Sequence, residues 1–236
     1  MTLQELMEHF FRMYERRNRI FLSSFGSRIN FLNLALGDLQ EAIRKEASAE
    51  HIGVALARCV SRIFCIAESF YNLPLVEVLA RKYPKGRCTY CNRWPCRCQE
   101  RRSDAGLALR PSAEQLQWSL GDWCTHFNSL YGLRNKSVGI ENILNRLFKE
   151  VSELLSIEMM IASMTEATLD EIELEIALES ADTLAWTIGV ANFLGVDLEE
   201  AVLKRFVNDG CWKCHQPQCV CGYFNLRPVK WEELPL

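Results

Sequence analysis

The strongest constraint on the fold of this chain is a four-cysteine cluster that occurs twice, at an offset of 123 residues. Each cluster has the spacing Cys-x2-Cys-x4-Cys-x-Cys. Four thiolates so close in sequence can surround one tetrahedral Zn²⁺, so each cluster is predicted to be a structural zinc knuckle. The predicted zinc ligands are Cys88, Cys91, Cys96 and Cys98 in the first knuckle and Cys211, Cys214, Cys219 and Cys221 in the second.

Metal binding is the preferred interpretation of these eight cysteines because clustered thiols in a reducing compartment favour metal over disulfides. A redox or iron–sulfur role and unligated thiols are the alternatives, and His215 is a candidate to replace one cysteine as ligand. The other three cysteines, Cys59, Cys65 and Cys124, stand alone in apolar patterns and are predicted to be small core residues.

The charge pattern predicts a cytoplasmic protein. The N-terminus carries Glu5 and Glu8 where a signal peptide would be basic and then apolar. The longest apolar stretch, residues 181–196, contains Asp182 and Asn192 and is shorter than the roughly 20 residues of a membrane-spanning helix. A net charge of −3 argues against nucleic acid as a partner, because a general nucleic-acid binder should be basic.

The repeat extends well beyond the cysteines. At the offset of 123, Phe70 corresponds to Phe193 and Glu77 to Glu200; farther upstream the offset becomes 112, and Glu41 corresponds to Glu153. The change places eleven extra residues in the second copy near residues 156–169, as a longer loop or a helix extension. We therefore expect two tandem domains, 1–105 and 106–236, joined by an exposed linker over residues 99–115.

Both copies are predicted to be all-α, because apolar residues recur at helical spacing and no convincing alternating strand is present. Four helices with short connections indicate a helical bundle in each copy, with a zinc knuckle at its C-terminal end. Two such bundles are expected to pack as a pseudo-dimer. The predicted helices are 6–22, 31–43, 52–71 and 75–83 in the first copy and 116–130, 140–155, 172–194 and 198–206 in the second.

Two acidic pairs stand out in the second copy. Glu150 and Glu153 lie three residues apart on one predicted helix, and Glu179 and Asp182 repeat this spacing on the next. If the helices are antiparallel, four carboxylates converge, which is costly unless a cation neutralises them. Such oxygen ligands suit Mg²⁺ or Mn²⁺. The alternative is that both pairs lie on solvated helix faces.

The second copy resembles the MazG-like all-α nucleoside triphosphate pyrophosphohydrolases over residues 141–208. The resemblance rests on Glu-x-x-Glu followed by Glu-x-x-Asp, on Asn142 before the first glutamate, on the Gly-Val-Asp-Leu turn at residues 195–198, and on Lys204 with Asn208. It implies an Mg²⁺ site and a phosphate-facing Lys and Asn beyond the last helix. The substrate-binding residues implied are Asn142, Trp186, Lys204 and Asn208.

The first copy departs from this pattern. Asp38 and Glu41 occupy the first acidic pair, but the second pair falls on Leu56 and Cys59, which cannot serve as hard metal ligands. We therefore expect a degenerate unit that still folds and forms part of the nucleoside pocket.

The resemblance implies Mg²⁺-dependent hydrolysis of a nucleoside triphosphate to the monophosphate and pyrophosphate. Glu153 is the expected general base and Lys204 the expected stabiliser of phosphate charge. The alternative is a non-catalytic zinc-knuckle protein that binds a nucleotide or another protein, and a homodimer of the tandem chain is compatible with either function.

Overall fold

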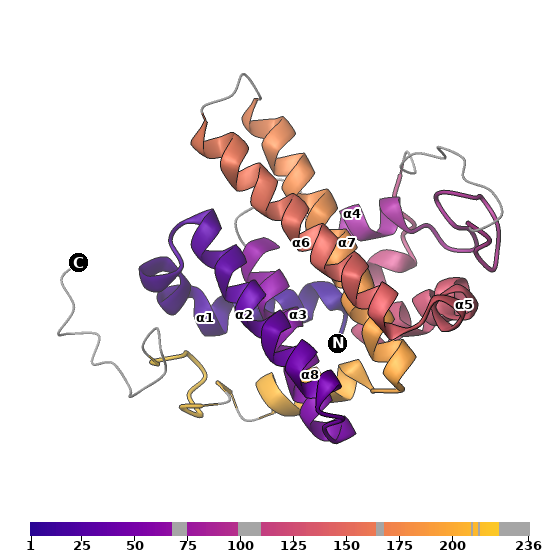
Figure 1. The fold of residues 1–236 in the computed structure, drawn as a ribbon. Coiled ribbons are helices and arrows are strands. Elements are labelled where there is room, and N and C mark those ends of the chain that lie inside the picture. The colour runs from indigo at the N-terminus through magenta and orange to yellow at the C-terminus, as the bar shows by residue number, and fades with distance from the viewer. Residues whose placement is uncertain (68–74, 99–109, 164–167, 209, 212, 222–236) are drawn as a thin grey trace.

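The computed structural model describes residues 1–67, 75–98, 110–163, 168–208, 210–211 and 213–221, and their regular secondary structure is helical (Figure 1). This confirms the predicted all-α class. A short 3₁₀ helix, η1, spans Gln115–Gln117. The α-helices are α1 (Leu3–Phe21), α2 (Phe25–Arg44), α3 (Ala49–Ala67), α4 (Leu75–Lys82), α5 (Leu120–Val138), α6 (Ile140–Ala162), α7 (Leu169–Leu194) and α8 (Leu198–Phe206).

The two predicted repeats, 1–105 and 106–236, form the first and second halves of the chain. The first helix of each half begins with the same type of N-terminal cap. Thr2 caps α1 and Ser119 caps α5, each through a capping box that is completed by an acidic residue three positions later, Glu5 or Asp122. The cap at Ser119 explains why α5 begins later than predicted, and the helix runs farther than predicted, to Val138 before Gly139. It also gives these two helices an offset of 117, which differs from both offsets read from the sequence.

The predicted turn between the last two helices is confirmed. Gly195 ends α7 in the left-handed conformation with φ of 69°, and the Asp197 side chain accepts a hydrogen bond from the backbone N–H of Glu200 at the start of α8. The sequence of Asn72–Pro74 predicts a matching turn in the first half, and this segment lies outside the described residues.

The eleven extra residues of the second half lengthen helices. Of their described part, residues 156–162 continue α6, which has 23 residues, and residue 169 begins α7, which has 26. The corresponding α2 and α3 have 20 and 19 residues. As a result, the ends of α6 and α7 project beyond the rest of the molecule (Figure 1).

The short helices cross between the halves. Helix α4, from the first half, packs against α7, and α8, from the second half, packs against α3. The long helices pack mainly within their own half, as α2 with α3 and α6 with α7, although α3 also contacts α7 and α2 contacts α6. Buried side chains of both halves form one continuous core. Neither half is therefore a bundle made only of its own consecutive residues.

Both knuckles also dock on the opposite half. The backbone N–H of Cys96 donates to the carbonyl of Leu130 on α5, at 2.9 Å. The N–H of Cys219 donates to the carbonyl of Met13 on α1, at 2.8 Å. The expectation that each knuckle caps the end of its own bundle is corrected here, because each one fastens its half of the chain to the first helix of the other half.

One end of the expected linker is also part of the core. Gln115 is fully buried; its amide donates to the carbonyl of Tyr83 and accepts from the N–H of Lys85. These two hydrogen bonds tie η1 to the segment that follows α4. Within the described residues, no helix is both long enough and apolar enough to cross a membrane.

Candidate metal centres

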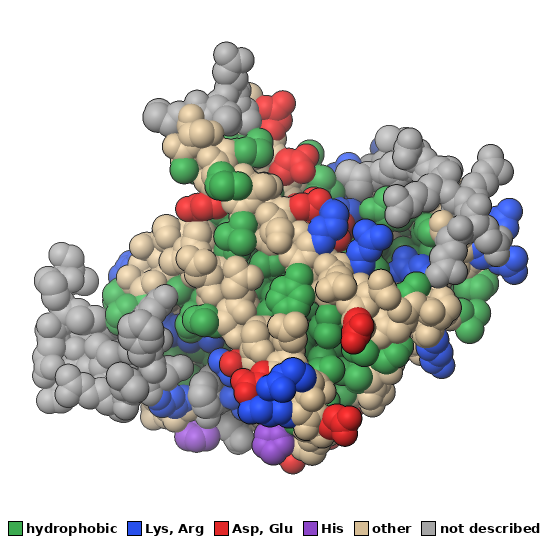
Figure 2. Space-filling model, viewed as in Figure 1, with side chains coloured by type: hydrophobic (Ala, Val, Ile, Leu, Met, Phe, Trp, Pro, Cys, Tyr) green, Lys and Arg blue, Asp and Glu red, His purple; other side chains and the backbone are tan. Residues whose placement is uncertain are grey.

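Three of the four predicted carboxylates meet between α6 and α7. Oxygen atoms of Glu150, Glu179 and Asp182 all lie within 4.8 Å of one another. Glu150 and Asp182 are each only 7% exposed. Figure 2 shows acidic and basic side chains side by side where the projecting α6–α7 pair meets the region around α4.

These carboxylates are held in an environment that disfavours their charge. Burial, with the neighbouring Glu153 and Asp182, raises the pKa of Glu150 to about 8. Burial also raises the pKa of Glu179 to about 7. The Oε2 atom of Glu179 is buried and has no hydrogen-bond partner. An unpaired buried carboxylate oxygen is costly, and a bound divalent cation would satisfy it.

Asp182 is held by two residues of the first half. The ammonium group of Lys82 lies 2.8 Å from its Oδ2 atom, and the hydroxyl of Tyr83 donates to its Oδ1 atom. Burial, together with the negative charges of Asp182, Glu150 and Glu179, also raises the pKa of Tyr90 in the first knuckle to about 12. Sequence analysis missed these three residues, since nothing in their spacing shows that α4 crosses to α7.

Glu153 lies at the rim of the cluster. Its side chain is 41% exposed and forms an ion pair with Lys149 one turn earlier. Burial opposes its ionisation, but hydrogen bonds with Lys149 and Glu150 leave the pKa of Glu153 below its usual value. Glu153 therefore stays ionised beside the more buried carboxylates, in a position that water can reach.

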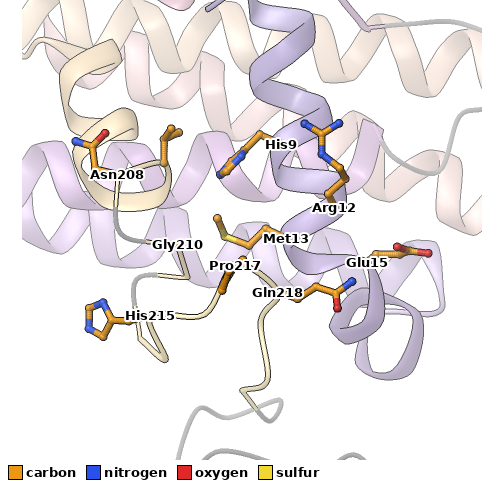
Figure 3. Close-up of a pocket in the computed structure, with 10 residues that line it drawn as sticks. His9, Arg12, Met13, Glu15, Asn208, Gly210, His215, Pro217 and Gln218 are labelled. Atoms are coloured by element: carbon orange, nitrogen blue, oxygen red, sulfur yellow. The ribbon is translucent and has the colours of Figure 1, made fainter.

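The other predicted site residues do not join the carboxylates. Lys204 is exposed and pairs with Glu50 of α3 at 2.9 Å, because α8 packs on α3. Asn208 lines a cavity of about 830 Å³ between α1 and the second knuckle (Figure 3). His9 of α1 lines the same cavity. The predicted grouping of Lys204 and Asn208 with the metal site is not what the structure shows, and Lys82 is the lysine that reaches it.

Asn142 and Trp186 also have local partners. The amide of Asn142 is exposed and donates to the carbonyl of Val138 at 2.7 Å. Trp186 is half-buried, and the guanidinium of Arg134 lies 5.1 Å from its ring centroid. The structure shows no contact of either residue with the three clustered carboxylates.

Both four-cysteine clusters are assembled in the described part of the chain. In the first, Sγ–Sγ distances are 3.3 Å for Cys96–Cys98, 3.5 Å for Cys88–Cys98 and 4.0 Å for Cys91–Cys96. In the second, Cys211 lies 3.5 Å from Cys219 and 4.0 Å from Cys221. Tetrahedral zinc with Zn–S bonds of about 2.3 Å requires sulfur atoms about 3.8 Å apart. Each cluster therefore fits one such ion.

The turns within the two clusters are alike. Asn92 and His215 both have positive φ, at 56° and 53°. The N–H of Asn92 donates to the carbonyl of Cys88, and that of His215 donates to the carbonyl of Cys211. His215 thus serves a turn position, and the clustered ligand atoms are those of the four cysteines.

The first half has no matching acidic site among its described residues. Leu56 and Cys59 are fully buried, in agreement with the sequence analysis. The remaining acidic pair is neutralised by local basic residues, since Asp38 lies 2.5 Å from Arg58 and Glu41 pairs with Lys45.

No family model, curated protein or solved structure matches this chain. The function is therefore inferred from the chemistry and geometry of the carboxylate cluster and its neighbours.

The raised pKa of Glu150 makes stability pH-dependent. In the native state Glu150 keeps a proton up to about pH 8, whereas in the unfolded state it releases that proton near pH 4.5. In the absence of divalent metal, the free energy of unfolding should therefore fall as the pH rises from about 4.5 to 8. Glu150→Gln should reduce this slope and stabilise the metal-free protein at pH 8 by on the order of a few kcal/mol. Urea unfolding at several pH values measures this, with the exposed Glu141→Gln as control. Equal slopes for Glu150→Gln and the parent protein would contradict it.

Proposed function

We propose that this chain is a Mg²⁺-dependent nucleoside triphosphate pyrophosphohydrolase, which releases the monophosphate and pyrophosphate. The observation that carries the proposal is the convergence of Glu150, Glu179 and Asp182 between α6 and α7, with one buried oxygen of Glu179 unpartnered. The resemblance of residues 141–208 to the MazG-like enzymes supports the same reaction.

Glu150, Glu179 and Asp182 would hold the ion, with Glu153 at the open rim as a fourth ligand or as a base. Bound Mg²⁺ or Mn²⁺ supplies charge neutralisation for the phosphates and lowers the pKa of an attacking water. Because Glu153 stays ionised and accessible, it is the carboxylate best placed to take the proton of that water.

Lys82 takes the role that the sequence suggested for Lys204. In the structure its ammonium neutralises Asp182, and its side chain is 13% exposed. Binding of a divalent ion by the carboxylates would weaken the Lys82–Asp182 pair, because both cations compete for Asp182. The ammonium group would then be available to a phosphate oxygen a few ångströms away. Tyr90, 46% exposed on the first knuckle, would form one wall of the substrate site.

The crossed packing supports a pseudo-dimer in which each half completes the other. Lys82, Tyr83 and Tyr90 belong to the first half, whereas the carboxylates belong to the second. Each cluster of four cysteines would bind one structural Zn²⁺, and this ion would fix the knuckle on the opposite half. One complete catalytic site per chain follows, since Leu56 and Cys59 remove the other.

The decisive experiment is a panel of nucleoside and deoxynucleoside triphosphates with Mg²⁺ or Mn²⁺, in which pyrophosphate release is measured. We expect turnover of at least one triphosphate, abolished when the divalent ion is omitted. No turnover of any nucleotide by a folded, zinc-loaded protein would favour the non-catalytic zinc-knuckle alternative.

Lys82→Met and Lys204→Met form a matched pair of variants. Lys82→Met should lower kcat by at least about tenfold, because a charge-assisted contact with the reacting phosphate is lost. Lys204→Met should have little effect, since its ammonium pairs with Glu50 on the surface. Steady-state kinetics on both variants measure the contrast. A larger loss in Lys204→Met than in Lys82→Met would contradict this placement.

A further inference from the structure

Two buried arginines lie together in the interior of the first half. Arg17 on α1 is 4% exposed and Arg62 on α3 is 5% exposed. Their guanidinium groups share the ring of Phe31 on α2, at 5.8 Å for Arg17 and 3.9 Å for Arg62. Arg17 also lies 4.2 Å from the ring centroid of Tyr14. Side chains of α1, α2 and α3 thus surround two cations.

Neither cation has an acidic partner in the described part of the chain. Arg17 donates to the side-chain oxygen of Asn18 at 3.0 Å, but its Nε is buried without a hydrogen-bond partner. The Nη1 atom of Arg62 and the hydroxyl of Tyr14 are likewise buried and unpartnered. Burial and the neighbouring charge of Arg17 lower the pKa of Arg62 to about 9. Unpaired like charges in an interior are costly, and an anion would remove that cost.

The second knuckle lies next to Arg17. The charge of Arg17 acts on the Cys219 thiol, so a zinc–thiolate centre would partly balance it. Arg62 forms no ion pair with the described residues, and its Nη1 atom is buried without a hydrogen-bond partner.

The second half keeps only part of this arrangement. At the offset of 117 between α1 and α5, Tyr14 and Arg17 correspond to Tyr131 and Arg134, and the Arg134 guanidinium lies 4.5 Å from the Tyr131 ring centroid. At the other offsets of the repeat, Arg62 corresponds to Ala185 and Phe31 to Ile143, so the second buried guanidinium is found only at the first-half position.

We propose that Arg17 and Arg62 form an anion site that takes a phosphate group, distinct from the carboxylate cluster. Guanidinium groups match the geometry of phosphate oxygens, and two of them balance a dianion. The buried Nε of Arg17, the Nη1 of Arg62 and the Tyr14 hydroxyl are the donors that the anion would satisfy. Inorganic phosphate and the phosphate group of an ester share this chemistry.

The test is a titration of the full-length, zinc-loaded protein with inorganic phosphate, followed by thermal unfolding and by calorimetry. No divalent ion is added, and the Lys82→Met background is included, so phosphate bound at the carboxylate cluster is not counted. We expect phosphate to raise the Tm, because it binds the folded state preferentially. A parallel titration with a nucleoside monophosphate distinguishes the ester from the free ion: the tighter ligand identifies the source.

Arg62→Met keeps the apolar stem and removes the charge. Without phosphate it should raise the Tm, because an unpaired buried cation is lost. The affinity of Arg62→Met for phosphate should be at least about tenfold lower than that of the parent protein, because one hydrogen bond to a charged group is lost. The matched control is Arg58→Met, one turn earlier on α3, which loses a partly exposed pair with Asp38 and should bind phosphate like the parent.

Two results would overturn the proposal. The first is a parent protein whose Tm and calorimetric heat do not respond to phosphate. The second is an unchanged phosphate affinity in a folded Arg62→Met protein. Either result leaves the proposed hydrolase function untouched, because that function is read from pyrophosphate release at the other site.

Discussion

Asp182→Asn is expected to reduce pyrophosphate release by at least about a hundredfold. Loss of one ligand misplaces the divalent ion, and such an ion contributes several kcal/mol to stabilising charge in the transition state. The substitution also leaves the ammonium of Lys82 without its carboxylate partner, 2.8 Å away in the parent protein. The measurement is single-turnover release of pyrophosphate at saturating Mg²⁺.

Glu41→Gln is the matched control for Asp182→Asn. Glu41 occupies the position of Glu153 in the first half, but it pairs only with Lys45 and lies near no cluster of ligands among the described residues. Its removal should leave the rate unchanged.

A melting experiment gives an independent readout. Mg²⁺ should raise the Tm of the parent protein and of Glu41→Gln, through binding to the folded state, and should not raise the Tm of Asp182→Asn. If Asp182→Asn kept both full activity and the Mg²⁺-dependent shift, the carboxylate cluster would not be the metal site.

Removal of zinc should destabilise the whole protein. Structural zinc contributes about 10–16 kcal/mol of apparent binding free energy in small zinc domains, and here each knuckle is hydrogen-bonded to the opposite half. Metal analysis should find about two zinc ions per chain. Chelation should abolish cooperative thermal unfolding or lower the Tm by more than about 10 °C, since most domains retain only 5–15 kcal/mol of stability.

Cys96→Ser tests one knuckle at a time. It should lower the zinc content to about one ion per chain and also reduce pyrophosphate release, because the first knuckle carries Tyr90, the proposed wall of the substrate site, whose pKa is raised by the charges of the carboxylates. Cys59→Ser, in the core and outside both clusters, should retain two zinc ions. Eight freely titratable cluster thiols in the native parent protein would contradict the zinc assignment.

The sequence by itself predicted the all-α class, the two cysteine clusters and the convergence of two acidic pairs, of which three carboxylates cluster in the structure. These features depend on local rules: side chains three residues apart share a helix face, and four cysteines within eleven residues can reach one ion. The glycine turn at Gly195 and the cap at Asp197 are equally local, and both were confirmed.

Only the tertiary structure decided which half supplies each wall of the site. The resemblance suggested Lys204, in the last helix of the same repeat, but α8 packs on α3 and pairs Lys204 with Glu50. Helix α4 crosses instead, and Lys82 and Tyr83 reach Asp182 from about 100 residues away in the chain. The two halves are similar and present similar apolar faces. The same helical pattern therefore permits a short helix to pack either on its own half or on the opposite half. The contacts of the folded chain choose between these arrangements, and that choice places Lys82 at the carboxylates and Lys204 on the surface.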